Sequence, residues 1–496
     1  MLNILGSSKQ LCGGLTRRDA LRVGGLGLAG ISLPDLFALQ DASAKDSALP
    51  GFGRAKSIIL IHLYGAPSQL EWADMKPDAP VEIRGELDGI QSNLPGCDVC
   101  ELLPYHAQVM DRVTVLRSLT HPHPIHGVAY ALTGVPSIDV AMELSPRDSR
   151  HWPFFGSVVD YVTSRSRTRP ADVPCNIALP FQFSSRRRGE VPRAGPYGAF
   201  FGSQFDPVWT EFAGTATRGH TKTLGEDVYT DNDPYMGVAE DCHFFVPAAT
   251  RVETSVTIDR LDRRKSLLTQ LNEARPGLYE SAAGRELGRH QQAALSILES
   301  DRLAHALDVR REPTPTRNLY GDALFGQACL AARRLVEVGT RVATVFWDEY
   351  GLAGTGWDTH WNHYPRMKNE LCPGFDRGWY GLITDLDQRG LLDETLVVCT
   401  SEHGRTPKLN KQKGGGRDHW SRVYTSLIAG AGVRRGHVVG ASDRHGSDVA
   451  DHPVSPKDLL ATMYHLLGID PHLTIVDRTG RPLPLVDGKV ISDALA

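Results

Sequence analysis

Short apolar runs alternate with amphipathic segments along much of the chain. Apolar residues recur at spacings of three and four over 324–338 and 375–386, which predicts two helices that end at Gly339 and Gly390. Ser455 precedes a proline and, three residues on, an acid, which is typical of a helix start. The apolar runs that read as strands are 57–63, 113–116, 342–347, 395–399 and 424–429. This alternation predicts an α/β fold with a mostly parallel central sheet flanked by helices.

The middle of the chain breaks this pattern. Residues 185–260 are rich in Gly, Arg, Asp, Pro and Thr with weak periodicity, and 259–308 are dominated by charged helical sequence. We expect about 185–310 to be a partly irregular insertion, or a lid over a site. The surrounding domain is expected to span 50–496.

Composition narrows the classes of function. The chain has 496 residues, 41% of them hydrophobic and 23% charged, with a formal net charge of −4. These are ordinary values for a globular protein with a large core. Because no basic block stands out, a nucleic-acid partner is not expected.

The N-terminus resembles an export leader. Lys9 and three arginines precede a Gly/Leu-rich apolar stretch, and the segment 42–44 offers small residues for cleavage. The pair Arg17-Arg18 is similar to a twin-arginine signal. We therefore expect residues 1–44 to be a signal peptide read by the Tat machinery, and the mature protein to be periplasmic or extracellular. The alternative is an apolar N-terminus of a cytoplasmic protein. The apolar stretch is too short for a stable membrane span, and none is expected later.

Cys97 and Cys100 form a CxxC without a second such pair. A zinc-ribbon pattern is therefore absent. A local disulfide and two unconnected cysteines are both open, and the second is favoured.

Three polar clusters follow or precede predicted strands, where ligands gather in open α/β sheets. The clusters are 356–363, which contains Asp358, His360 and His363; 401–407, which contains Glu402, His403 and Arg405; and 416–420, which contains Asp418 and His419. Imidazole and carboxylate groups together suit zinc or a similar divalent metal, and a pair of ions would suit phosphoryl or sulfuryl transfer. The alternative is that the clusters are hydrogen-bonded structural loops.

A fourth cluster, 120–126, contains Thr120, His121, His123 and His126 and precedes a possible helix over 125–133. A helix N-terminus at this point would favour an anion and a nucleophilic oxygen. The two prolines would instead suit a stiff turn with exposed histidines, and both interpretations stay open.

As an ordered set, these motifs resemble a large bacterial family that carries a domain of unknown function and belongs to the alkaline phosphatase/sulfatase-like superfamily. The resemblance covers essentially the whole chain. It rests on the leader, Gly65–Ser68 with Lys76-Pro77, Ala331–Leu335, Gly356–His360, Glu402–Pro407, Gly416–Trp420 and Gly480–Pro482.

The resemblance implies a hydrolase fold with two metal ions. Asp358 with His360 or His363, together with Asp418 and His419, would match one metal site, and Glu402 with His403 the other. Thr120 and Arg405 would be the catalytic residues, with His121, His123 and His126 at the substrate. The metal is expected to be Zn, or Ca or Mg.

Two departures stand out. Relatives carry an acid at the end of the first strand, where this chain has Tyr64-Gly65 and its nearest acids are Glu71 and Asp74. The Cys-x-Pro-x-Arg motif of formylglycine sulfatases is absent.

The leading hypothesis is thus an exported, metal-dependent hydrolase of phosphate or sulfate esters, acting on a small-molecule or polysaccharide substrate. The alternative is a non-catalytic relative that binds a polysaccharide or a cell-surface partner. Phosphomutase or transferase chemistry is a third and weaker possibility.

Overall fold

The computed structural model describes most of the chain after the leader. The described residues are 49–123, 128–135, 140–146, 148, 150–164, 173–187, 193–224, 227–247, 284, 300–352, 355–477 and 479–496. The expected signal peptide and His126 lie outside them. Among these residues, no helix combines the length and the apolar character that crossing a membrane requires.

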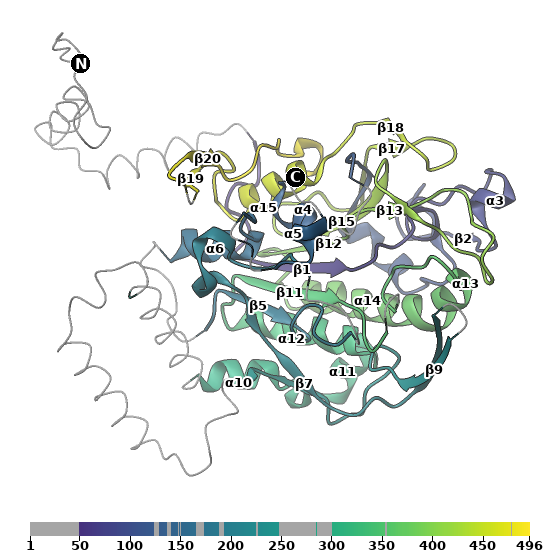
Figure 1. Cartoon of the computed structure of the whole chain (residues 1–496), viewed down its shortest axis with the longest axis horizontal. Helices are drawn as coiled ribbons and strands as arrows, with labels where there is room; N and C mark the ends of the chain where they lie inside the picture. Colours follow the sequence, from purple (N-terminus) through teal and green to yellow (C-terminus); the bar gives the residue numbers. More distant parts are fainter. Residues whose placement is uncertain are drawn as a thin grey trace, which may run out of the picture.

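An eight-stranded sheet forms the centre of the protein, in the order β16-β4-β15-β12-β1-β11-β5-β6 (Figure 1). Neighbouring strands are parallel, except that β15 is antiparallel to both β12 and β4. The strands are β1 (Ser57–Leu63), β4 (Val113–Leu119), β5 (Asn176–Leu179), β6 (Val208–Trp209), β11 (Val342–Trp347), β12 (Thr395–Thr400), β15 (Tyr424–Ala429) and β16 (His437–Val439). The predicted class, α/β with a mostly parallel central sheet, is confirmed.

The sheet is buried on both faces, which explains why its strands are continuous apolar runs. In β1, Ile59 and Ile61 pack into one core, whereas Ile58 and Leu60 pack into a second core on the opposite face. Alternate side chains of a strand point to opposite faces, so a strand between two cores needs apolar residues at nearly every position. The polar residues of this strand are Ser57 at its start and His62, which is fully buried.

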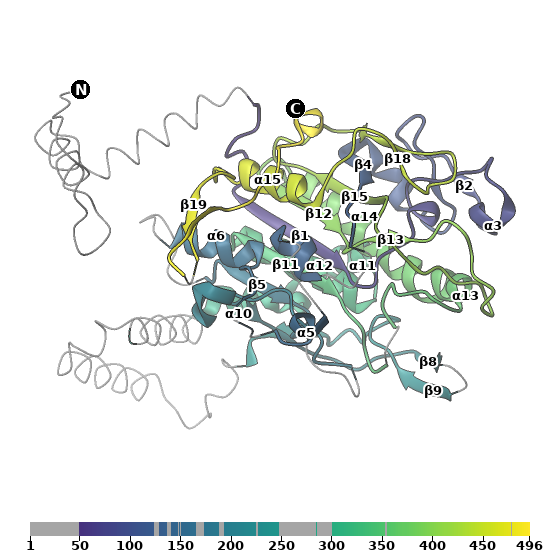
Figure 2. The same ribbon diagram turned by 45° about the horizontal axis from the view of Figure 1, so that its top comes forward.

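Helices cover the two faces of the sheet (Figures 1 and 2). On one face lie α12 (Leu324–Glu337) and α14 (Cys372–Gln388), and on the other α4 (Val128–Thr133), α6 (Phe155–Thr163) and α15 (Pro456–Leu466). The helices predicted from periodicity are confirmed, and α15 begins with a capping box between Ser455 and Asp458. The other α-helices in the described part of the chain are α3 (Val81–Arg84), α5 (Val140–Glu143), α10 (Asp301–Leu307), α11 (Thr314–Tyr320) and α13 (His363–Arg366).

The described part of the expected insertion contains short strands. β6 joins the edge of the central sheet, and β7 (Glu211–Ala213) pairs with β10 (His243–Phe245). β8 (Gly219–Leu224) and β9 (Asp227–Asn232) form a hairpin that stands out from the body (Figure 2). This region is therefore partly irregular, and one of its strands belongs to the main sheet.

Within the ranges given above, four further pairs of short strands lie in the loops. β13 (Gly404–Arg405) pairs with β14 (His419–Trp420), and this ladder matters for the site below. The others are β2 (Gly89–Ile90) with β3 (Val99–Cys100), β17 (Ala441–Ser442) with β18 (Val449–Asp451), and β19 (Thr474–Val476) with β20 (Pro482–Pro484).

Cys97 and Cys100 are both free and buried. Arg117 donates a hydrogen bond to the Cys97 sulfur at 3.2 Å. Burial raises the pKa of the Cys100 thiol to about 12. The preferred interpretation of two unconnected cysteines agrees with this environment, in which neither thiol is a ready nucleophile.

Candidate metal centre

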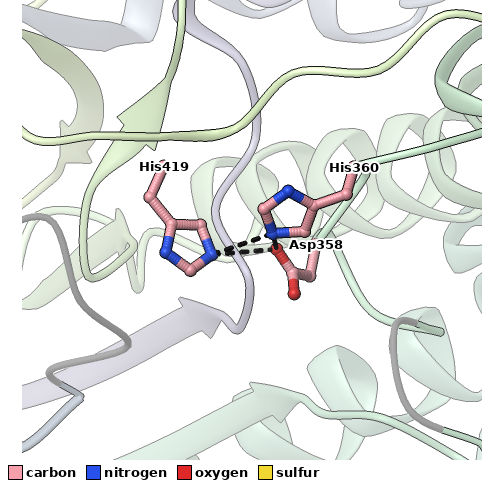
Figure 3. A group of neighbouring side chains, drawn as sticks. All are labelled: Asp358, His360 and His419. Carbon is pink, nitrogen blue, oxygen red and sulfur yellow. Dashed lines mark hydrogen bonds and ion pairs between the residues drawn. The ribbon is translucent and has the colours of Figure 1, made fainter. Parts of the chain in front are cut away.

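Three polar side chains meet beyond the carboxyl ends of β11 and β12 (Figure 3). The Oδ1 atom of Asp358 lies 3.0 Å from Nε2 of His360 and 3.3 Å from Nε2 of His419. The two imidazole Nε2 atoms are 3.1 Å apart. The side chains are 15%, 27% and 21% exposed, respectively. A carboxylate and two imidazoles from distant parts of the chain therefore converge at a place that solvent can reach.

A second carboxylate orients one of these imidazoles. Nδ1 of His360 lies 2.7 Å from Oδ1 of Asp418. Because a carboxylate only accepts, Nδ1 of His360 carries a proton, and its Nε2, which faces Asp358, is the nitrogen at which a metal ion would take the place of a proton. The hydrogen bond to Asp358 raises the pKa of His360 against the effect of its burial, and Asp418 adds to the rise. Asp418, predicted as a metal ligand, thus contacts Nδ1 of His360, on the side of the ring away from Asp358. It is not a member of the converging group.

The backbone brings these residues together through the β13–β14 ladder. Arg405 and His419 are directly opposite each other in this ladder. The loop that carries Asp358 and His360 packs against the segment before β14, where a Cβ on Gly416 would lie 1.9 Å from the His360 carbonyl oxygen. Only glycine allows this close approach.

The end of β1 also holds the loop in place. The main-chain N–H of Trp357 donates to the carbonyl of Tyr64 at 2.9 Å. Gly65 has a φ of +93°, and a Cβ on it would lie 2.3 Å from the Asp358 nitrogen. Arg366, which is buried, donates to the Asp358 carbonyl at 3.1 Å. The position of Asp358 is therefore fixed by main-chain contacts on both sides.

Arg405 is fully buried beside Asp358. Its guanidinium donates to Oδ1 of Asp358 and to the carbonyls of Gly65, Ala66 and Arg417. This arginine, predicted to be catalytic, touches the carboxylate from the interior and has no exposed surface.

His363, another predicted ligand, faces a different carboxylate. Its Nε2 is 3.5 Å from Glu71, and its Nδ1 is 2.8 Å from the Thr359 hydroxyl. Glu71 also pairs with Arg417, and the side chains of the ion pair and of His363 are fully buried. Burial alone would raise the pKa of Glu71, but Arg417 and His363 hold it at about 2. The structure separates His363 from the converging group and places it in a buried ion network.

Glu402 and His403 occupy the turn after β12. Glu402 accepts the Gly65 N–H at 2.7 Å through Oε1, and its Oε2 lies 3.3 Å from Nε2 of His62. His403 is buried, and its ring centroid lies 4.5 Å from that of His419. Nδ1 of His403 lies 2.8 Å from the Gly404 carbonyl, so it carries the proton. Glu402 thus connects the turn after β12 to the end of β1, and the His403 ring packs against the ring of His419.

The described part of the 120–126 cluster, residues 120–123, lies at the end of β4. Nε2 of His121 lies 2.8 Å from the Glu402 carbonyl, and its Nδ1 accepts the N–H of His123 at 3.2 Å. Burial, as the largest effect, lowers the pKa of His121 to about 4. Both nitrogens of this predicted substrate-binding histidine are therefore engaged within the protein. Thr120 is partly exposed at the strand end, and its N–H donates to the Val454 carbonyl.

The converging group fits a divalent metal of the zinc type. Tetrahedral zinc with ligands at about 2.0–2.1 Å places its ligand atoms about 3.3 Å apart, close to the separations of 3.0 to 3.3 Å between the three atoms here. Two imidazoles and one carboxylate are ligands that zinc accepts, whereas calcium and magnesium prefer oxygen alone. Three protein ligands leave a coordination position open, as in catalytic sites.

Sequence reasoning missed the residues that support this group from inside. His62 and Glu71 were not assigned to it, and Gly65 was noted only as part of a turn. A signal existed for His62, which is the single titratable residue of the first apolar run. The pairing of Glu71 with Arg417, 346 positions later, carries no such local signal.

Comparison with known proteins gives a family and a set of distant structural similarities. The family model described as "Protein of unknown function (DUF1501)" matches residues 55–495. A search of curated proteins found no match.

Similar solved structures include Ps i-CgsB, at 13% identity and a TM-score of 0.37, covering 87% of this chain and 74% of that one. The PsFucS1 sulfatase from Pseudoalteromonas sp. has 11% identity, a TM-score of 0.37, and coverage of 92% and 76%. The phosphonate monoester hydrolase SpPMH from Silicibacter pomeroyi has 12% identity, a TM-score of 0.32, and coverage of 88% and 75%. TM-scores this low leave the chemistry to be read from the site itself.

Proposed function

The chain belongs to the DUF1501 family of proteins of unknown function, and we propose that it is a metal-dependent hydrolase of phosphate or sulfate esters. The observation that carries this proposal is the convergence of Asp358, His360 and His419. Their three electron-rich atoms lie within 3.0 to 3.3 Å of one another. Such atoms repel unless a proton or a cation lies between them.

A divalent ion at this place supplies Lewis-acid polarisation of a phosphoryl or sulfuryl oxygen. The chain's own residues supply the rest. Asp418 holds the proton of His360 at Nδ1, so that the opposite nitrogen stays available as a ligand. Arg405, held by three main-chain carbonyls, places a positive charge next to Asp358. An ester that carries negative charge is favoured near such a concentration of positive charge.

Thr120 is the proposed nucleophile. It lies at the carboxyl end of β4, and the next residue, His121, contacts the main chain of Glu402 in the site loop. The Thr120 side chain is partly exposed. Thr120→Val keeps the shape of the side chain and removes the hydroxyl, so hydrolysis should be lost while metal binding stays unchanged.

The proposal is tested with the purified protein, its bound metal and a panel of aryl phosphates, phosphodiesters and aryl sulfates. Asp358→Asn, His360→Ala and His419→Ala should each lose metal and hydrolysis. His472→Ala, which changes an exposed histidine in the C-terminal segment, is the matched control and should lose neither. The proposal fails if the protein binds no divalent metal, or if hydrolysis survives all three site variants.

One result would favour the non-catalytic alternative. Binding of a polysaccharide that persists in His419→Ala and after chelation, together with the absence of hydrolysis in the wild type, would indicate a binding protein on the same fold.

Export is proposed with the function, since the leader residues Arg17 and Arg18 match a twin-arginine signal. We propose a periplasmic or extracellular site of action, with an ester of a small molecule or a polysaccharide as substrate.

A further inference from the structure

The end of β1 has no room for an acidic ligand. A Cβ on Gly65 would lie 2.3 Å from the main-chain nitrogen of Asp358 and 2.9 Å from its Cα. Because these are backbone atoms, no small side-chain movement relieves the contact. The preceding residue, Tyr64, is buried, with its ring edge-on to Phe183 at 5.5 Å. The backbone of the site loop therefore fills the space that a carboxylate at this strand end would need.

One oxygen of Glu402 is committed to the main chain, and the other lies near a buried imidazole. Oε1 accepts the Gly65 N–H at 2.7 Å, and Oε2 faces Nε2 of His62 at 3.3 Å. The Glu402 and His62 side chains have no exposed surface. Using Oε1 of Glu402 as a metal ligand would leave the buried Gly65 N–H without its partner, which buried polar groups rarely tolerate.

A positive charge already occupies the inner side of Asp358. The Arg405 guanidinium contacts the same Oδ1 atom that faces His360 and His419. It cannot lose its charge, and three carbonyl groups hold it in place. A second metal ion next to Asp358 would therefore be a third positive charge around this one carboxylate, beside the first ion and the Arg405 guanidinium, where like charges repel.

We infer that this centre takes a single divalent ion, bound by Asp358, His360 and His419, and that Arg405 supplies the second positive charge that a two-metal hydrolase takes from its other ion. The inference deepens the proposed function and rests on it, since it concerns the same site. Arg405 is then a positioning residue: it holds Asp358 in place and its positive charge favours the anionic ester, which it does not touch.

Stoichiometry is the first test. The metal-free full-length protein is titrated with Zn²⁺ by calorimetry, and bound zinc is counted by mass spectrometry after gel filtration. The wild type should bind one ion per chain. Glu402→Gln, which keeps the shape and one acceptor oxygen, should also bind one ion, with a Kd within about threefold of the wild type. Asp358→Asn should bind none.

The outcomes separate two failures. Two ions in the wild type, or a loss of zinc in Glu402→Gln, would overturn the single-ion inference and leave the hydrolase proposal standing. No bound zinc in the wild type would remove the hydrolase proposal itself.

Substrate charge tests the role of Arg405. An aryl phosphate monoester carries two negative charges near neutral pH and an aryl phosphodiester carries one. In Arg405→Gln, kcat/KM for the monoester should fall at least tenfold more than kcat/KM for the diester, with one zinc still bound. Arg405→Lys, which keeps the charge, should keep the ratio of the two values within about threefold of the wild type.

If Arg405 had a purely structural role, Arg405→Gln would lower kcat/KM by the same factor for both substrates, and this result would contradict the assignment. If Arg405→Gln does not fold, Arg405→Lys decides alone, because a collapse of its monoester-to-diester ratio would show that retaining the charge is not what matters.

Discussion

Asp418 offers a sharp test of the metal centre, because the sequence predicted it as a ligand and the structure places it behind one. Asp418 is 57% exposed and touches His360 through Nδ1 at 2.7 Å. Its main chain is held independently, by the Thr406 hydroxyl at 2.9 Å and the Thr406 N–H at 2.8 Å. Replacement of the carboxylate should therefore leave the β13–β14 ladder intact and change only the support of His360.

The magnitude follows from what each substitution removes. Loss of a residue that orients a metal-bound imidazole typically costs 10- to 100-fold in metal affinity. Asp418→Asn keeps an oxygen that accepts from Nδ1 and loses only the charge, so we expect about 10-fold weaker zinc binding, or about 1.4 kcal/mol. Asp418→Leu also removes the acceptor, frees the tautomer of His360 and should approach about 100-fold.

The assay is competition for Zn²⁺ against a chelating indicator at fixed pH. Asp393→Asn is the matched control, because Asp393 is an exposed carboxylate, 73% accessible, just before the opposite end of β12. Its zinc affinity should equal that of the wild type. Unchanged affinity in both Asp418 variants would refute the orienting role, whereas complete loss of zinc in Asp418→Asn would show that Asp418 is a ligand after all.

Three further predictions concern stability and export. Burial lowers the pKa of His106 from 6.5 to about 3, so below pH 6.5 the unfolded chain binds a proton that the folded chain does not. Between pH 6.5 and pH 5, the free energy of unfolding should therefore fall by about 1.6 kcal/mol more in the wild type than in His106→Leu; urea titrations at the two pH values with a chelator present measure this, and an equal fall in the two proteins would contradict it. Ser455→Ala removes the capping box of α15 and should cost about 1 kcal/mol, read as a lower urea midpoint at an unchanged m-value. Replacing both Arg17 and Arg18 by lysine should leave the uncleaved chain in the cytoplasmic fraction, and normal export of this variant in cell fractionation would rule out the twin-arginine route.

The central strands were predictable because burial on both faces forces their composition. β1 pairs with β11 on one side and with β12 on the other in the middle of the sheet, and all three strands are largely apolar. β5 and β6 were not predicted, since they have four and two residues, too few for a periodic signal. The antiparallel direction of β15 also has no local signature, because direction is set by the path of the connecting loops.

The loops that form the candidate site were predictable from the sequence, but the contacts of their individual side chains were not. Polar clusters after the parallel strands β11 and β12 must share one edge of the sheet, so the proximity of the Asp358 and Glu402 loops follows from topology. His419 joins them because β15 is antiparallel to β12 and therefore begins at that edge. Which histidine faces which carboxylate does not follow from topology. His360 and His363 are three residues apart, yet one faces Asp358 and the other Glu71, because α13 begins at His363 and turns its side chain into the core.

The absence of an acid at the end of β1 and the inward position of Glu402 have one physical cause. Gly65 must lack a side chain because the Asp358 backbone packs against it, and the N–H left open at this glycine is what Glu402 accepts. The close approach of the loop to β1 thus leaves no room for an acid at position 65 and engages Glu402 in a main-chain hydrogen bond. The carbonyl of the same glycine accepts from Arg405, which brings a permanent positive charge to Asp358 as a consequence of that contact. An acid at position 65 would displace the loop and break the contacts that Glu402 and Arg405 make with Gly65. The path of the backbone at the end of β1 and the proposed number of metal ions therefore depend on each other.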